Sequence, residues 1–154
     1  MKAFISEYVW NIGIVTPIDL SDTGHHMTIN WIKDIPRSSW YADPFILQYD
    51  EYKIEILAEE YIKQSKKGII SLLTIDAKNY KLIQSQKILE LDTHLSFPLI
   101  YRDGDKTYIL PENYQSGHLT IYEYDSIGKC LVNPHIILEE AVVDSSIMKI
   151  NNVR

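Results

Sequence analysis

Four acidic residues occupy positions where carboxyl groups could do acid–base chemistry. Asp43 follows two aromatic residues and precedes a proline in "WYADPF", and Glu60 closes the apolar run "KIEILAEEY". Glu112 lies in "ILPEN" and Asp144 in "VVDSS". A pair of carboxyl groups can act as general acid and general base. Asp43, Glu112 and Asp144 are therefore the candidate catalytic residues, provided that the fold brings them together.

Residues close to these acids are candidates for binding a substrate. Trp40 offers a flat ring on which a sugar can stack, and Phe97 lies beside Pro98 in "HLSFP". His94 either donates a hydrogen bond to a sugar hydroxyl or stabilises a turn. Glu60 and Glu59 alternate faces if they lie in a strand, so only one of them can face a shared site. We choose Glu60, because it aligns with Glu112 in the repeat described below.

Each candidate also has a purely structural interpretation. An Asp before a proline commonly accepts backbone N–H groups in a turn, and a Glu at the end of a strand is commonly solvated. The eleven tyrosines and three tryptophans of the chain are better explained by packing on pleated sheets than by stacking on a sugar.

The sequence predicts no metal or cofactor. Its histidines and its single cysteine do not have the short, definite spacing of a zinc site. A calcium ion between converging acids is compatible with the composition, but no motif specifies one.

The elements that must position these residues are short strands. Runs rich in Ile, Leu, Val and Tyr alternate with polar or glycine-containing breaks, which indicates strands joined by turns. The first set covers 44–49, 53–61, 68–76 and 81–91, and the second covers 96–101, 107–113, 118–125 and 133–140. We predict an all-β protein with no long helix.

The two sets form a repeat. Pro98 follows Pro44 by 54 positions, and Glu112 follows Glu60 by 52. A third set begins at 142–150, where Asp144 takes the place of Phe97. Four strands in about fifty residues are typical of one β-propeller blade, with a plain β-sandwich as the alternative. Antiparallel pairing puts the end of each second strand beside the start of the first, so the acids should gather at one mouth.

The domain prediction is a partial β-propeller over residues 1–154, about half of a five-bladed ring. It consists of a closing-strand region (1–37), one blade (38–92), a second blade (93–141) and the start of another (142–154). Because a partial ring leaves sheet edges open, we expect a homodimer or a further C-terminal half to complete it.

Composition excludes several classes of partner. A formal net charge of −6 and an isoelectric point near 5.3 argue against nucleic acid binding. No apolar run approaches the roughly 20 residues of a membrane helix. Glu7 interrupts the N-terminal apolar stretch, and Cys130 has no second cysteine to pair with. We therefore predict no signal peptide and a cytoplasmic location.

The segments "WYADPF", "LAEEY", "HLSFP" and "ILPEN" resemble those of five-bladed propellers of the arabinanase, levansucrase and invertase type. The strongest resemblance is to the glycosidase-like domain at the N-terminus of glucosamine inositolphosphorylceramide transferases. Likeness to the family 43 glycoside hydrolases implies that Asp43 is the general base. Phe97 departs from the acid expected at the second position, and Asp144 stands where a Glu acid is expected, so Glu112 or Glu60 would have to substitute.

The function that follows is a carbohydrate-processing or carbohydrate-binding propeller with an acidic axial pocket, resembling a glycoside hydrolase. The alternatives are a non-catalytic module that presents a glycan or nucleotide-sugar to a transferase, and a purely structural propeller. The residues leave open whether the domain is an enzyme, although Phe97 in place of an acid favours the non-catalytic alternative.

Overall fold

The computed structural model describes residues 9–15 and 28–148 and shows two four-stranded antiparallel sheets and a small hairpin. The first sheet contains β3 (Ser39–Tyr49), β4 (Lys53–Ile62), β5 (Lys67–Asp76) and β6 (Leu82–Leu89), paired in chain order. The second contains β7 (Ser96–Asp103), β8 (Lys106–Glu112), β9 (Leu119–Asp125) and β10 (Cys130–Leu138), also in chain order. Both predicted sets of four strands are confirmed, and the described residues contain no α-helix.

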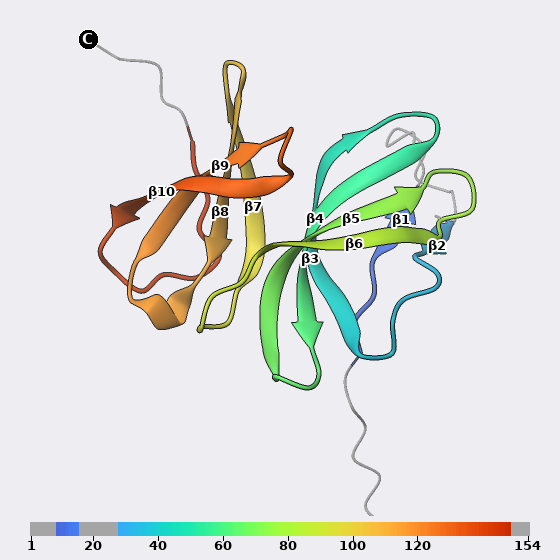
Figure 1. Ribbon diagram of the computed structural model, residues 1–154, viewed down its shortest axis with the longest axis horizontal. Coiled ribbons are helices and arrows are strands. Elements are labelled where there is room, and N and C mark those ends of the chain that lie inside the picture. Colours follow the sequence, from blue (N-terminus) through green and yellow to red (C-terminus); the bar gives the residue numbers. More distant parts are fainter. Residues whose placement is uncertain (1–8, 16–27, 149–154) are drawn as a thin grey trace, which may run out of the picture.

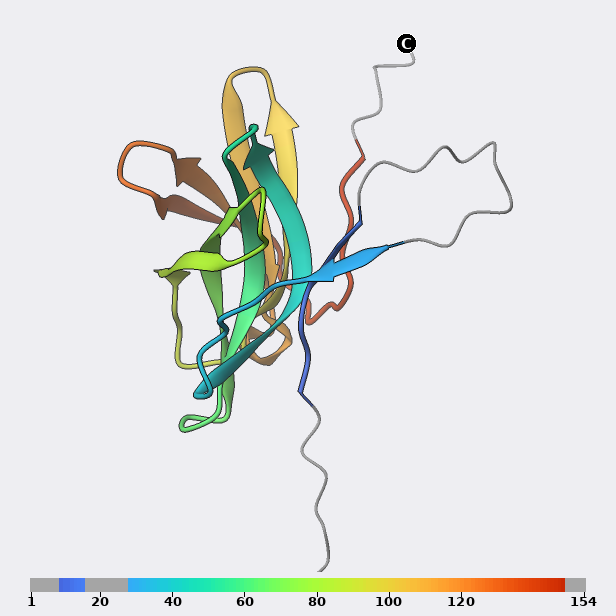
Figure 2. The same cartoon turned by 90° about the vertical axis from the view of Figure 1, so that its right-hand side faces the viewer.

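The hairpin covers one face of the first sheet. It pairs β1 (Gly13–Val15) with β2 (Ile29–Trp31), three residues each. Figure 2 shows it crossing the β3–β6 sheet. Within the predicted closing-strand region (1–37), the described residues form only these two short strands.

The two sheets stand side by side, with the first strand of each, β3 and β7, in contact (Figure 1). An apolar layer between them includes Leu57, Ile70, Leu72, Leu95 and Ile109. A second layer lies between the hairpin and the first sheet and includes Ile12, Ile32, Tyr41, Ile56 and Leu73. Burying each of these side chains contributes about 1.5–3 kcal/mol. The continuous apolar run in β5 follows from this arrangement, since β5 is covered on both faces.

Aspartates shape three of the hairpin turns. Asp50, Asp76 and Asp125 each end a strand region, and their Oδ1 atoms accept backbone N–H groups two or three residues further on. These turns are short because an Asp side chain can satisfy the N–H groups that a tight reversal leaves unpaired.

The third predicted set does not begin with a strand. Residues 142–148 have no strand partner in the part of the chain that the structure describes, and they run as an irregular segment beside β8. A strand requires a neighbour for its backbone groups, and none is present there. Residues 1–8, 16–27 and 149–154, including the N-terminal stretch around Glu7, lie outside the described residues. In the described ranges no helix has the length and apolar character needed to cross a membrane.

Candidate functional site

The residues predicted to stand at the entrances of first strands share an unusual backbone conformation. Asp43, Phe97 and Asp144 have φ angles of 48°, 44° and 49°. This left-handed region costs a non-glycine residue about 1–2 kcal/mol. Beside Asp43 and Phe97 the strand pairing shifts register, between Ala42 and Phe45 and between Ser96 and Leu99. Each of these two residues therefore forms a bulge that redirects its backbone out of the regular ladder.

The redirected N–H groups bind carboxylates from the preceding part of the chain. The Phe97 N–H donates to Asp43 Oδ2 at 3.3 Å, and the Asp144 N–H donates to Glu112 Oε2 at 2.9 Å. Asp43 thus joins the entrance of β3 to the entrance of β7, and Glu112 joins the end of β8 to the segment after β10. Two of the predicted catalytic acids therefore hold successive repeats together at one end of the sheets.

His94 stands between these acids. Its Nε2 lies 3.3 Å from Glu59 Oε1, and its Nδ1 accepts the Gly68 N–H at 3.0 Å. Its backbone N–H donates to Gln115 Oε1 at 3.0 Å. A ring whose Nδ1 accepts a hydrogen bond carries its proton on Nε2 when neutral, so the proton faces Glu59.

Charge and burial act on His94 in opposite directions. The hydrogen bond that His94 donates to Glu59 raises the pKa of His94, burial opposes this rise, and the charges of Glu59, Glu112 and Asp43 add to it. The Gly68 N–H also opposes protonation, because it faces the nitrogen that would gain the second proton. Asp43 and Glu112 therefore both lie near enough to act on this one ring.

Gly68 makes the close approach of β5 and the 94–95 segment sterically possible. A Cβ atom at Gly68 would lie 2.4 Å from the Leu95 carbonyl oxygen, 2.8 Å from Glu59 Oε1 and 2.9 Å from His94 Cε1. Contacts below 3.0 Å require atoms to move, and here one of them belongs to the backbone. The glycine therefore lets His94 sit over Glu59.

The structure corrects the choice between the two adjacent glutamates. Ala42, which precedes Asp43, pairs with Glu59, and Ser96, which precedes Phe97, pairs with Glu112. Glu59 and not Glu60 is therefore the structural equivalent of Glu112. The alignment of Glu60 with Glu112 was therefore displaced by one residue. A shift of one residue moves the aligned side chain to the opposite face of the strand. Glu59, only 5% exposed, faces His94.

Glu60 lies on the opposite face of β4. Its Oε2 accepts hydrogen bonds from Ser71 Oγ at 2.8 Å and Ser85 Oγ at 2.7 Å. These contacts tie it to the hairpin side of the first sheet, away from His94.

Aromatic rings extend the site along the sheet edge. Trp40 stacks on Tyr61 with centroids 4.5 Å apart and planes 9° from parallel. Tyr61 in turn lies 6.2 Å from the His94 ring. Phe97 packs edge-on against Phe45 at 5.0 Å. Trp40 and Phe97 thus lie close to the acids, and each is fixed by a neighbouring ring.

A small open hollow of about 170 Å³ lies at this end of the second sheet, lined by His94, Glu112, Tyr114, Gln115 and Val143. It is smaller than the roughly 300–1,000 Å³ of sites that enclose a drug-sized ligand. We name the group formed by Asp43, Glu59, His94, Phe97, Glu112 and Asp144 the acid–histidine cluster. The cluster and its hollow offer carboxylates, an imidazole and an amide, which together suit hydroxyl groups.

The cluster contains members that the sequence did not identify. Gln115 and Tyr114 follow β8 in a short 3₁₀ turn, Tyr114–Ser116, and nothing in their spacing links them to His94. Tyr61 stood at the end of a predicted strand without a distinguishing signal. Glu59 could have been found from the strand register. In the described residues, no group of three His, Cys, Asp or Glu side chains is arranged to hold a metal ion.

Comparison with known families gives one match. The family model described as "Glucosamine inositolphosphorylceramide transferase 1, N-terminal" matches residues 26–153. The chain belongs to this family. The match covers both four-stranded sheets and every member of the acid–histidine cluster. Searches of curated proteins and of solved structures gave no match. Membership in the glucosamine inositolphosphorylceramide transferase N-terminal family confirms the strongest of the resemblances, whereas the likeness to arabinanase-type propellers stays a prediction.

Proposed function

We propose that this chain is a non-catalytic carbohydrate-binding domain associated with a glycosyltransferase. In this proposal the acid–histidine cluster binds a glycan or nucleotide-sugar and presents it to a transferase domain. The two sheets are successive blades of a partial five-bladed propeller, and the cluster lies at its axial mouth. Membership in a transferase N-terminal family supports the association.

The observation that supports the proposal is that the acids already interact with other groups of the protein. Asp43 holds the Phe97 N–H, Glu112 holds the Asp144 N–H, and Glu59 is buried against His94. Inverting hydrolysis needs two carboxyl groups about 6.5–9.5 Å apart, one a free acid and one a base that activates water. Two of these acids already accept backbone N–H groups, so their side chains are held in fixed positions by the protein itself. Phe97, at the second of the three positions, supplies no charge.

The same groups are suited to binding a sugar without cleaving it. Carboxylate oxygens that hold one N–H retain lone pairs for sugar hydroxyls, and Gln115 offers an amide at the rim of the hollow. Tyr114 is 58% exposed beside it and provides a ring for stacking.

The test is a panel of two assays on the chain. A thermal-shift screen with mono- and oligosaccharides and nucleotide-sugars should find stabilising ligands, and chromogenic aryl glycosides should show no turnover. The stabilisation should be lost in Glu112→Gln and retained in Glu123→Gln, a surface acid paired with Lys106. Turnover that Glu112→Gln abolishes would establish a glycoside hydrolase instead. Absence of both binding and turnover would leave a purely structural domain.

A further inference from the structure

A second hollow lies on the other face of the first sheet, where the β1–β2 hairpin covers it. It has a volume of about 440 Å³, and its lining includes Val9, Trp10, Ile32, Ile35, Arg37 and Ser39. We name it the hairpin pocket. Its volume falls within the roughly 300–1,000 Å³ typical of ligand sites. Because Glu59 and Glu60 point to opposite faces of β4, this pocket is separate from the acid–histidine cluster.

The inner wall of the hairpin pocket carries a hydroxyl group that lacks a partner. Ser39 is 3% exposed, and its Oγ has no hydrogen-bond partner in the described part of the chain. Behind it, the hydroxyl of the fully buried Tyr41 also has none, although it lies close to Ser39, Ser85 and Glu60. Buried polar atoms without partners are uncommon in folded proteins. Ser39 lines the pocket, so a ligand there can satisfy its hydroxyl group.

The lining of the pocket carries one aromatic ring, Trp10, and two cationic residues, Arg37 and Lys63. Trp10 is 59% exposed, which leaves much of its indole available. Arg37 is exposed and makes no ion pair or hydrogen bond with the other described residues. In a chain with a net charge of −6, an arginine left without a carboxylate is a natural contact for an anionic ligand. Its planar guanidinium fork matches carboxylate and phosphate oxygens.

We propose that the hairpin pocket binds an acidic monosaccharide unit. The apolar face of the sugar ring stacks on Trp10, a ring hydroxyl bonds to Ser39, and the acidic group pairs with Arg37. A neutral sugar would leave Arg37 unused, and a simple anion would leave Trp10 and Ser39 unused. This inference goes beyond the proposed function, because it concerns another pocket and another chemical class of ligand.

The test is calorimetric titration of the chain with glucuronic acid, glucose 6-phosphate, glucose and inorganic phosphate. We expect at least one acidic sugar to bind ten-fold or more tightly than glucose and than inorganic phosphate. The tighter of glucuronic acid and glucose 6-phosphate identifies the acidic group as carboxylate or phosphate. Equal affinity for glucose and both acidic sugars would overturn the proposal, as would inorganic phosphate that binds as tightly as the sugars.

Variants locate the site. Arg37→Gln should reduce the affinity for the acidic sugar to that for glucose, and Ser39→Ala should weaken both sugars. The charge-matched control Lys78→Gln, in the turn after β5, should change neither. Because Arg37 is exposed, its variant should fold normally. An acidic-sugar affinity unchanged in Arg37→Gln would contradict the assignment even if binding itself were observed.

Discussion

At the scale of single residues, three strained positions organise the candidate site. Asp43, Phe97 and Asp144 adopt the left-handed conformation without being glycine, and the N–H groups of Phe97 and Asp144 each point at a carboxylate. Backbone strain persists where the surrounding structure fixes it, and it is common at binding sites. Here the strain positions the acids rather than activating them.

His94 gives the first prediction at this scale. Glu59 raises the pKa of His94, so Glu59→Gln should lower it. Because the folded-state pKa lies above the ordinary value of 6.5, the interaction stabilises the fold below about pH 6.5. That stabilisation is lost as the pH rises through the folded-state pKa.

The measurement is a proton NMR titration of the histidine rings from pH 5 to pH 9 in the native chain and in Glu59→Gln. The other histidines serve as internal references. A His94 titration midpoint that stays the same or rises in Glu59→Gln would show that this carboxylate does not act on the ring.

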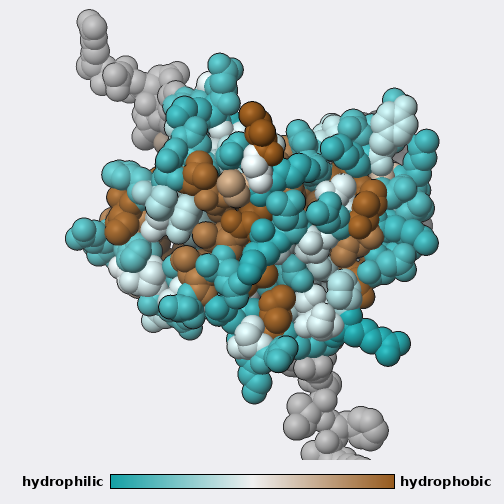
Figure 3. Space-filling model, in the orientation of Figure 1, coloured by the Kyte–Doolittle hydropathy of each residue, from teal (hydrophilic) through white to brown (hydrophobic). Residues whose placement is uncertain are grey.

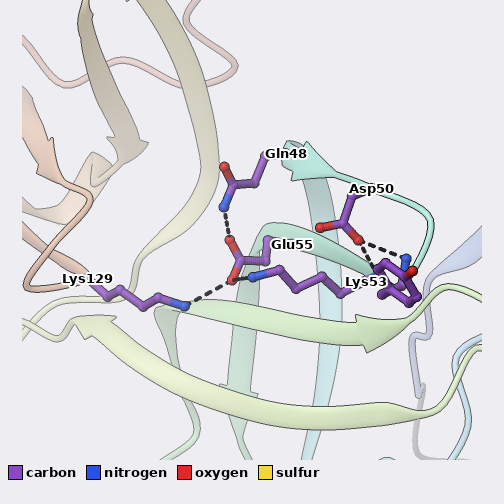
Figure 4. Close-up of polar contacts among 6 residues, drawn as sticks. Gln48, Asp50, Lys53, Glu55 and Lys129 are labelled. Atoms are coloured by element: carbon purple, nitrogen blue, oxygen red, sulfur yellow. Dashed lines mark hydrogen bonds and ion pairs between the residues drawn. The ribbon is translucent and has the colours of Figure 1, made fainter.

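At the scale of elements, close approach and buried charge join the strands. Gly68 in β5 contacts the backbone at Leu95, so the first sheet meets the start of the second with no side chain between them. At the other end of the same sheets, Glu55 in β4 is 1% exposed. It accepts hydrogen bonds from Gln48 and Lys53 and from Lys129 of the β9–β10 turn at 2.9 Å (Figure 4).

Gly68→Ala tests the close approach. The new methyl group would overlap the Leu95 carbonyl oxygen and the His94 ring, so we expect a loss of about 1–3 kcal/mol in the free energy of unfolding. Urea unfolding measures it, with Gln64→Ala in the exposed β4–β5 turn as the control. An unfolding midpoint equal to that of the control would mean that the two segments are farther apart than described here.

Glu55→Gln tests the buried charge. Burial alone would raise the pKa of Glu55, but hydrogen bonds from Lys129 and Gln48 and the lysine charges outweigh it and lower the pKa. Its stabilising effect is therefore present above the ordinary value of 4.5 and is lost as the pH falls through the folded-state pKa.

We expect Glu55→Gln to cost about 1–3 kcal/mol at pH 7, because Lys129 loses its carboxylate. The cost should shrink toward pH 3. The surface pair variant Glu123→Gln should cost less than Glu55→Gln, because solvent screens an exposed ion pair. Urea unfolding at pH 7 and pH 3 provides the comparison, and equal costs for the two variants at pH 7 would rule out a special role for Glu55.

Much of this architecture could be predicted from sequence, because strand patterns and turn residues are local. The runs at 53–61 and 68–76 became β4 and β5. Register could not be predicted, since it depends on bulges at Asp43 and Phe97 that follow from tertiary contacts. That is why Glu60 was preferred to Glu59. The segment around Asp144 has a strand-like sequence, but no described strand pairs with it. The hydrogen bond between His94 and Gln115 depends on tertiary structure, so the sequence does not reveal it.

At the scale of the whole molecule, the two sheets leave apolar surface exposed. The outer strand β10 has Ile136, Ile137 and Leu138 exposed by 45%, 42% and 40%, and no described strand pairs with its outer edge. In Figure 3 apolar side chains gather in patches on the half of the surface that belongs to the second sheet. Open, apolar edges favour pairing with another chain.

We therefore expect the chain to associate at micromolar concentration, and Ile137→Lys to shift it toward a monomer. Light scattering coupled to size-exclusion chromatography measures the mass. Ile127→Lys is the matched control, since Ile127 is 95% exposed in the β9–β10 turn and should leave association unchanged. A well-folded native chain that remains monomeric would contradict both completion by a second copy and an incomplete ring.

The central claim is that the end of the sheets holding Asp43, His94 and Glu112 binds carbohydrate. The most direct measurement is an amide chemical-shift titration of the ¹⁵N-labelled chain with the sugar that stabilises it most. The account predicts saturable shifts concentrated at residues 94–97, 112–115 and 143–145. Shifts confined to the opposite end of the sheets, around residues 48–55 and 126–130, would contradict it.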